Sequence, residues 1–387
     1  MQKFDAFTGN LAIATAWKQI NPDVCAAYPI TPSTEVVMLY SDFVANGEVD
    51  TEMVTVESEH SAMSACIGAS LAGGRVVTAT SSAGLAYMWE MLSVASGLRT
   101  TIVLACVNRA LSAPLNIHCD HSDAMGAKDT GWIQIFSENA QEAYDNMIQA
   151  FRIAEHSDVR LPVMVCNDGF IISHSFEKMQ YIDDEEVRAF VGEYNTKHSL
   201  FDFNKAEAFG AMVLPNYYIE FKRQQREAME KSKNVILEVG REFGEKFGRN
   251  YGFFEEYLLD DAEIVFVVMS SAAGTVKHVV NELRKNGNKV GVLKPRVFRP
   301  FPADEIALSL KDAKVVCVLD RAETFGGEGG PLFLEIKSAL KNNENQKVVN
   351  RIFGLGQRDF LPQHVFELFQ ELKAKDTKKF GYINVRE

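Results

Sequence analysis

In the turn at residues 28–35, YPITPSTE, the hydroxyl-bearing Thr31 lies between two prolines that restrict the backbone. The turn follows an apolar run over residues 24–30 that is typical of a β-strand. Because proline fixes φ, the hydroxyl of Thr31 would be held in one place, and Ser33 or Thr34 could cap the next helix. Such a turn suits a polar ligand, but it is equally typical of a helix start shaped by proline.

Two carboxylates, Glu57 and Glu59, lie where a predicted strand over residues 53–56 runs into a helix rich in Ala, Ser and Gly. Since strand side chains alternate, the two should point to different sides. A carboxylate buried under the small-residue helix would have a raised pKa and could share a proton with a ligand nitrogen. The alternative is a solvent-exposed acidic first turn, which the helix dipole favours.

Two later strand-to-helix turns, at residues 80–91 and 107–125, hold further candidates. In TSSAGLAYMWEM, Gly84 permits close approach of a ligand, but the chain has neither GxGxxG nor GxxxxGK[ST] there, so dinucleotide and P-loop binding are not supported. In VNRALSAPLNIHCDHSDAM, Arg109 ends a predicted strand and is placed for a bidentate grip on a carboxylate or phosphate.

The turn at residues 107–125 also contains a group of metal-ligand residue types, although such a polar loop more often hydrogen-bonds to itself or to a neighbour. The group comprises His118, Cys119, Asp120, His121 and Asp123. The six cysteines are scattered without a CxxC pair, and five lie in or beside apolar stretches, which predicts buried thiols. We therefore expect no zinc site or iron–sulfur cluster in this chain.

The elements that must position these residues alternate between strands and helices, which is typical of a doubly wound parallel sheet. Ligands of such sheets bind in the turns at the carboxyl ends of the strands, where the candidates lie. We expect a first α/β domain over residues 1–170, a connecting segment with one long charged helix over 171–260, and a second α/β domain over 261–387. A helix over 139–158 has one apolar stripe, and Asn139 followed three residues later by Glu resembles a capping box.

Composition limits the classes of protein that the chain can be. It has 387 residues, 47% hydrophobic and 24% charged, with a net charge of −12. These values indicate a multi-domain globular protein and disfavour general binding to nucleic acid or to an anionic membrane. The N-terminus lacks the apolar core of a signal peptide, and no run approaches the roughly 18 apolar residues that span a bilayer, so a cytoplasmic location is expected.

Together the four turns resemble the pyrimidine-binding domain of the thiamine-diphosphate-dependent 2-oxoacid:ferredoxin oxidoreductases, in particular the α subunits of those that act on pyruvate. The motifs are YPITPSTE, ESEHSAM with Glu59, TSSAG, and VNRALSAP with Arg109. KPRVFRPFP at 294–302 and DRAETFGGEGGPLF at 320–333 resemble the second domain of that subunit, which is similar to the C-terminal domain of transketolase. The resemblance covers essentially the whole chain and implies this order of two α/β domains.

The resemblance also implies roles for individual residues. A glutamate at the position of Glu59 hydrogen-bonds the N1′ nitrogen of the cofactor's aminopyrimidine, and Thr31 and Arg109 match residues that hold the carboxyl and oxo oxygens of a 2-oxoacid. The cofactor supplies the electron sink for decarboxylation, electrons pass singly to iron–sulfur clusters, and coenzyme A accepts the acyl group. The remaining implied members of the cofactor pocket are Tyr28, Pro29, Ser82 and Gly84.

Two features of that family are missing from this sequence. A GDG motif with a downstream Asn binds the Mg²⁺ that holds the diphosphate, but the nearest string here, CNDGF at 166–170, lacks the first Gly and the Asn. Cysteine ligands for clusters are also missing. The resemblance therefore implies β, γ and δ-type partner subunits that supply Mg²⁺, the diphosphate site and the clusters, with the active site at a subunit interface and ferredoxin docking on another subunit.

Several alternatives stay open at this point. The chain could act with another 2-oxoacid, such as 2-oxoglutarate or a branched-chain acid, or be the β subunit of a 2-oxoacid dehydrogenase complex that delivers to a lipoyl arm. It could also be a non-catalytic scaffold that retains the fold. The GGEGG string in the second domain fits either a phosphate-binding loop or a packing turn.

Overall fold

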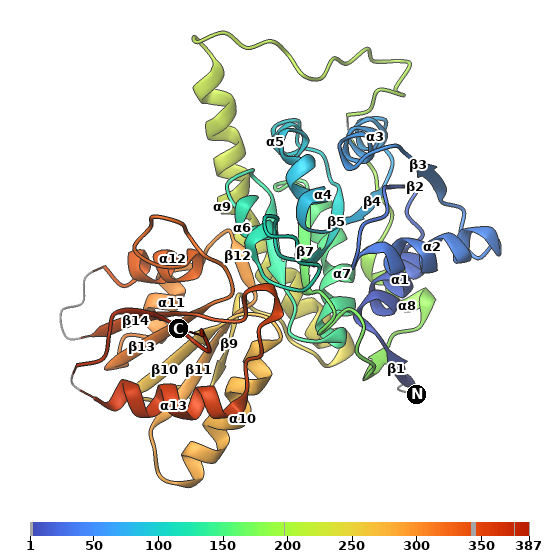
Figure 1. Ribbon diagram of the computed structural model, residues 1–387. Coiled ribbons are helices and arrows are strands. Elements are labelled where there is room, and N and C mark those ends of the chain that lie inside the picture. Colours follow the sequence, from blue (N-terminus) through green and yellow to red (C-terminus); the bar gives the residue numbers. More distant parts are fainter. Residues whose placement is uncertain (1–2, 197, 342–345, 375, 387) are drawn as a thin grey trace.

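A seven-stranded sheet with strand order β12-β6-β7-β5-β4-β2-β3 forms the core of the N-terminal part (Figure 1). The computed structural model describes residues 3–196, 198–341, 346–374 and 376–386. All neighbouring strands of this sheet pair in parallel except β12, which pairs antiparallel to β6. The strands are β2 (Val24–Ala27), β3 (Glu52–Thr55), β4 (Val76–Thr80), β5 (Val103–Asn108), β6 (Ile133–Phe136), β7 (Val163–Asp168) and β12 (Val297–Arg299).

Helices cover both faces of this sheet, as the doubly wound prediction required. The first, second and seventh helices share one apolar core with the sheet, and the third to sixth share the other. At the start of the seventh helix, Asn139 accepts the backbone N–H of Glu142 at 2.9 Å, whereas the Glu142 carboxylate accepts from Glu138, so half of the expected capping box forms. The helices are α1 (Gly9–Ile20), α2 (Thr34–Ala45), α3 (Glu59–Leu71), α4 (Ser82–Tyr87), α5 (Trp89–Gly97), α6 (Ser122–Gly126) and α7 (Ala140–Glu155).

A second sheet, of order β15-β14-β13-β10-β11-β9, forms the C-terminal part. Its strands are parallel except β9, which pairs antiparallel to β11. The strands are β9 (Phe254–Tyr257), β10 (Ile264–Val268), β11 (Val290–Pro295), β13 (Val315–Asp320), β14 (Lys347–Ile352) and β15 (Phe380–Tyr382). The helices are α10 (Ala272–Lys285), α11 (Ala303–Ser309), α12 (Pro331–Ala339) and α13 (Pro362–Lys373), with a 3₁₀ turn η1 (Leu355–Gln357).

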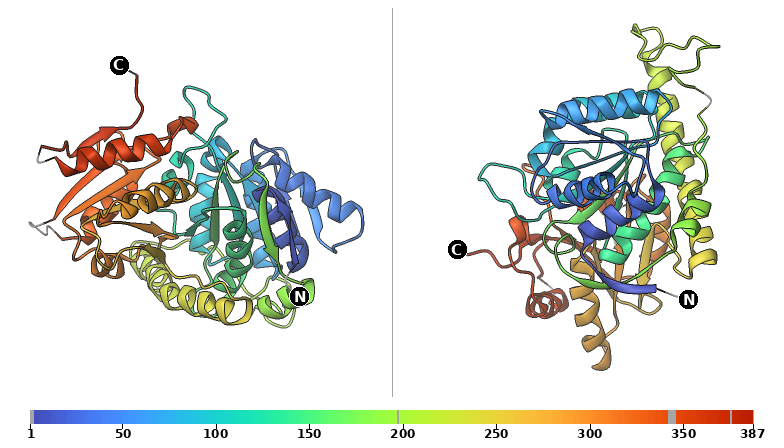
Figure 2. Two further views of the ribbon diagram at one scale, coloured as in Figure 1. Left: turned by 90° about the horizontal axis from the view of Figure 1, so that it is seen from below. Right: turned by 90° about the vertical axis from the view of Figure 1, so that its right-hand side faces the viewer.

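The stretch between the two sheets contains more than a connecting helix. Strand β8 (Glu177–Tyr181) pairs antiparallel to β1 (Lys3–Phe7), and α8 (Asp184–Val191) follows it. The long helix is α9 (Tyr218–Phe247), which buries one face against α7 and lies along the outside of the first domain (Figure 2). In the part of the chain that the structure describes, no helix combines the length and the apolar character that crossing a bilayer requires.

The KPRVFRPFP segment carries the chain from one sheet into the other. Lys294 and Pro295 belong to β11 of the second sheet, whereas Val297–Arg299 pairs with β6 of the first. Between them the buried Arg296 donates to the Asn146 side chain at 2.7 Å, to Gln149 at 3.0 Å and to the carbonyl of Gly252. Lys294 forms ion pairs with Glu138 and Glu142 of the first domain. A buried, fully bonded polar network thus joins the domains.

Candidate active site

The four polar turns lie at one edge of the first sheet. Strands β5, β4, β2 and β3 are neighbours and parallel, so their carboxyl ends meet there. Thr31 follows β2, Glu59 follows β3, Gly84 follows β4 and Arg109 follows β5. The sheet therefore brings together residues that are up to 78 positions apart in the sequence.

Glu59 is the first residue of α3, and its side chain is 7% exposed. Ser58 caps the helix by accepting the N–H of Ser61 at 3.2 Å, which fixes where α3 begins. Glu57, by contrast, is exposed, and a hydrogen bond from Ser61 lowers the pKa of its carboxyl. Of the two sequence alternatives, the acidic surface turn describes Glu57, and the buried carboxylate is Glu59.

Gly84 leaves the space that the Glu59 side chain occupies. A Cβ at Gly84 would lie 2.7 Å from Oε1 of Glu59 and 2.5 Å from the hydroxyl oxygen of Thr80. Among the described residues no donor reaches the Glu59 carboxylate, although the residue is buried. The carboxylate is therefore free to form a hydrogen bond with a bound group that reaches it.

Arg109 and Thr31 lie in direct contact. The guanidinium donates from Nη1 to the Thr31 carbonyl at 3.0 Å and from Nε to the Asn116 carbonyl at 3.1 Å. Thr31 is exposed and precedes a cis peptide bond to Pro32. Nη2 of Arg109 has no hydrogen-bond partner among the residues that the structure describes, so the guanidinium is held by two carbonyls while donors remain for an anion. Tyr28 and Pro29, which precede Thr31 in the same turn, are exposed.

Asp123 ties the turns after β4 and β5 together, a role that the sequence did not reveal. Its buried carboxylate accepts the backbone N–H of Ser82 and of Arg109, each at 2.9 Å, and the Asn108 amide at 2.8 Å. Burial raises the pKa of this carboxyl. Ser82 is buried, and its hydroxyl donates to the Ala110 carbonyl at 2.5 Å. In this structure the Ser82 side chain holds its own turn in place.

The group of metal-ligand residue types divides into separate parts. Cys119 and His121 meet Asp168, the aspartate of CNDGF, whereas His118 is exposed. Asp168 accepts from His121 Nε2 at 2.7 Å and from Arg321 Nη1 at 2.6 Å, and it also contacts Ser271. Burial alone would raise the pKa of Asp168, but the Arg321 and His121 charges outweigh it and hold that pKa well below its usual range.

These contacts make Asp168 a junction between the domains. Asp168 ends β7 of the first sheet, while Ser271 and Arg321 follow β10 and β13 of the second. The Arg321 guanidinium places a positive charge beside the Asp168 carboxylate, in the role that a bound metal ion would have there. The structure therefore favours an ion-pair role for this cluster over a metal role.

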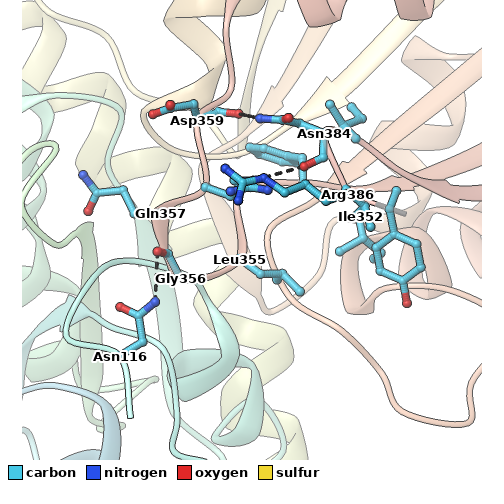
Figure 3. Close-up of a pocket in the computed structure, with 14 residues that line it drawn as sticks. Asn116, Ile352, Leu355, Gly356, Gln357, Asp359, Asn384 and Arg386 are labelled. Carbon is cyan, nitrogen blue, oxygen red and sulfur yellow. Dashed lines mark hydrogen bonds between the residues drawn. The ribbon is translucent and has the colours of Figure 1, made fainter. Parts of the chain in front are cut away.

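A cavity of about 680 Å³ lies at the carboxyl end of β14, between η1 and the C-terminal segment (Figure 3). Asn116 links this cavity to the first domain. Its side-chain amide donates to the Gly356 carbonyl at 3.1 Å, and its backbone carbonyl accepts a hydrogen bond from Arg109. In the neighbouring GGEGG string, a Cβ at Gly330 would lie 2.3 Å from the Asp320 side chain. Gly330 therefore packs tightly against the end of β13.

The family comparison agrees with this arrangement. Residues 15–241 match the model described as "Pyruvate flavodoxin/ferredoxin oxidoreductase, thiamine diP-bdg", and residues 262–365 match that of the pyruvate:ferredoxin oxidoreductase core domain II. The chain belongs to the pyruvate:ferredoxin/flavodoxin oxidoreductase family. In the members of this family the first match is a thiamine-diphosphate-binding domain, and here it contains all four turns.

Relatives in this oxidoreductase family match along nearly their whole length. The chain is 52% identical to pyruvate synthase subunit PorA of Thermotoga maritima, over 95% of this chain and 93% of the relative. It is 46% identical to the PorA subunit of Methanocaldococcus jannaschii, over 100% and 99% of the two chains. It is also 46% identical to ketoisovalerate oxidoreductase subunit VorA of Pyrococcus abyssi, over 95% and 92%.

Solved structures show the same fold. A 2-oxoglutarate:ferredoxin oxidoreductase from Magnetococcus marinus superposes with a TM-score of 0.76 at 20% identity, covering 95% of this chain and 65% of that longer chain. A split-gene transketolase superposes with a TM-score of 0.51 at 12% identity and covers 96% of both chains. The second likeness agrees with the transketolase-like arrangement that the sequence predicted.

Proposed function

We propose that the chain is the α-type catalytic subunit of a thiamine-diphosphate-dependent pyruvate:ferredoxin oxidoreductase. The reaction converts pyruvate and coenzyme A into acetyl-CoA and CO₂ and delivers two electrons, one at a time, to ferredoxin. The observation that carries the proposal is the buried Glu59 in the space left by Gly84, at the same end of the sheet as the paired Thr31 and Arg109. The pyruvate synthase subunits named above support the choice of substrate.

The residues present fit thiamine diphosphate at its pyrimidine end. Glu59 is a buried residue whose carboxylate makes no hydrogen bond to the described residues, and Gly84 provides the gap beside it. We assign to the Glu59 carboxyl a hydrogen bond to a ring nitrogen of the pyrimidine, where it holds or releases a proton. When bound, the cofactor supplies the electron sink that decarboxylation of a 2-oxoacid requires. Gly84 and the Ser82 turn shape this side of the pocket.

Arg109 and Thr31 would hold the substrate. The free Nη2 edge of Arg109 suits the carboxylate of a 2-oxoacid, and its two anchored donors keep the guanidinium in one orientation. The hydroxyl of Thr31 can donate to the oxo oxygen from the neighbouring exposed turn. Tyr28 and Pro29 would cover the substrate from the same turn. Binding and orientation are therefore separated from the proton chemistry of Glu59.

Partner subunits would supply what this chain does not. All six cysteines are buried, so none of them presents a thiolate ligand at the surface. Asp168 of CNDGF is occupied by Arg321 and His121. We therefore place Mg²⁺ and the diphosphate site on a β subunit, and the iron–sulfur clusters on the β and δ-type subunits of a complex that also contains a γ subunit.

The test is an anaerobic assay of the native complex, purified through a tag on this chain. We expect reduction of a low-potential viologen dye that requires pyruvate, coenzyme A and thiamine diphosphate. A branched-chain 2-oxoacid is the second candidate substrate, because a ketoisovalerate oxidoreductase subunit is 46% identical to this chain. Turnover with 2-oxoisovalerate or 2-oxoglutarate but not with pyruvate would assign the chain to that substrate, and no turnover with any 2-oxoacid would support the scaffold alternative.

A further inference from the structure

Residues 198–221 form an arm that leaves the first domain and includes the first turn of α9. At the top of Figure 1 the arm runs from above α3, past α5, to the end of α9, and the right-hand view of Figure 2 also shows it standing clear of the sheet. The arm carries nine exposed large apolar side chains. They are Leu200, Phe201, Phe203, Met212, Leu214, Tyr217, Tyr218, Ile219 and Phe221.

Such a surface is unfavourable in water. Phe203 is 90% exposed, and it stacks on the ring of Phe201 with ring centroids 6.2 Å apart. The first buried residue of α9 is Ala228, so the N-terminal turns of this helix extend beyond their packing partners. Helix ends without packing are marginally stable, and clustered exposed apolar side chains mark interaction surfaces. The arm therefore presents the features of a segment that another chain covers.

The base of the arm is fixed to the C-terminal ends of two helices. At α3, the backbone N–H of Leu200 donates to the Leu71 carbonyl at 2.9 Å, and the Ser199 hydroxyl donates to Ala72. At α5, the Gln225 amide of α9 donates to the Ser96 hydroxyl at 2.8 Å. The arm thus has a defined position relative to α3 and α5, the same helices that follow β3 and β4.

The outward faces of α3 and α5 extend from the arm to the Glu59 site. Helix α3 begins at Glu59, and α5 begins at Trp89, which is exposed. A Cβ added at Gly68 of α3 or at Gly97 of α5 would meet nothing within 4 Å, so the surface of each helix is open at these positions near the arm. A chain that brings a cofactor to Glu59 and also covers the exposed Trp89 would lie along α3 and α5, and its flank would then meet the arm.

We propose that the arm clasps the partner chain that holds the cofactor's diphosphate and so keeps the shared active site assembled. The inference rests on the proposed function, because it takes that chain as the occupant. The surface of the partner chain should be apolar where it contacts Phe201, Phe203 and the first turns of α9. The arm contacts neither Glu59 nor Arg109 within this chain, so its contribution is to association and not to the chemistry.

The experiment measures association and turnover separately in the full complex. Phe203→Ser combined with Phe221→Ser alters the arm, and Phe325→Ser combined with Leu308→Ser is the control, since these are exposed residues of the second domain. Both variants are titrated with the purified diphosphate-binding subunit, and the dissociation constant is measured by sedimentation. We expect the arm variant to raise it by about tenfold or more, as truncation of buried aromatic anchors does, while turnover returns at saturating partner. The control should bind as the wild type does.

Other outcomes overturn the proposal. An unchanged dissociation constant would show that this subunit does not cover the arm. If binding of that subunit is unchanged but two copies of the complex no longer associate, the arm contacts a second copy instead. Equal thermal midpoints exclude misfolding, and the single variant Phe203→Ser repeats the test at the most exposed position. Failure of the proposed function is distinct, because the wild-type complex would then turn over no 2-oxoacid whatever the arm variant does to binding.

Discussion

Gly84 faces Glu59 so closely that a Cβ at the glycine would lie 2.7 Å from the carboxylate oxygen Oε1. The two residues follow different strands, β4 and β3, and neither strand is adjacent to the other, since β2 lies between them. The glycine is therefore required by a tertiary contact and not by its own backbone conformation. It keeps open the place that the Glu59 side chain occupies.

Gly84→Ala is expected to lower turnover of the complex by about tenfold or more, since a displaced acid–base group loses much of its assistance. The atoms in the way belong to the side chains of Glu59 and Thr80, so these can shift and the fold should survive. Steady-state turnover and the thermal midpoint are measured together. Gly126→Ala is the matched control, because a Cβ there meets nothing within 4 Å. If the Gly84→Ala complex turned over at the wild-type rate, the assignment of Glu59 to the active site would be contradicted.

Glu59→Gln should leave assembly intact and lower turnover by about two or more orders of magnitude, the scale of general acid–base catalysis. Glutamine keeps the size and polarity of the side chain but cannot exchange the proton. Glu57→Gln provides the control, since Glu57 is exposed and two positions away. A Glu59→Gln complex with unchanged kcat would contradict the role assigned to this carboxylate.

Arg109→Lys is expected mainly to raise KM for the 2-oxoacid, with a smaller change in kcat. The lysine ammonium is a point charge, so it cannot hold two backbone carbonyls and also grip a carboxylate in bidentate fashion. Initial rates across a range of pyruvate concentrations separate the two constants. If KM stays the same while the subunits fail to assemble, Arg109 is a structural residue.

Asp168→Asn should destabilise the chain by about 3–5 kcal/mol at neutral pH, because Arg321 is left buried without its anionic partner. The pKa of Asp168 is lowered in the folded state, so its contribution is present above its unfolded value of about 4 and is lost as pH falls toward the folded value. Urea unfolding at several pH values tests this. The part of the difference that comes from the Asp168 carboxylate should shrink as pH falls below about 4. Asp158→Asn, at an exposed position, should show no such difference.

The sequence predicted which residues lie at the carboxyl end of the first sheet because parallel sheets place the turns after their strands at one end. Thr31, Glu59 and Arg109 each stand directly after a recognisable apolar strand, and the fold aligns the ends of those strands. Whether Glu57 or Glu59 is buried could not be decided locally, because both follow the same strand and only the packing of α4 distinguishes them. Their catalytic roles remain predictions.

Other features depend on contacts between distant parts of the chain. Asp123 looked like one of several metal ligands, and its bonds to Ser82 and Arg109 arise only when the turns after β4 and β5 meet. Strand β12 has three residues, too few to show a pattern that would identify it. The arm lies within the connecting segment predicted over residues 171–260, and its exposure could not be predicted because aromatic content alone does not show whether side chains are buried.

The pairing of β12 with β6 has a consequence for synthesis of the protein. The chain leaves the ribosome N-terminus first, so β6 is complete about 160 residues before the strand that covers it has been translated. Until Arg299 has emerged, the nascent first sheet exposes the backbone groups of its β6 edge, and such edges pair readily with other strands. The first domain is thus open to wrong partners during translation, and its protection comes from residues that belong to the second.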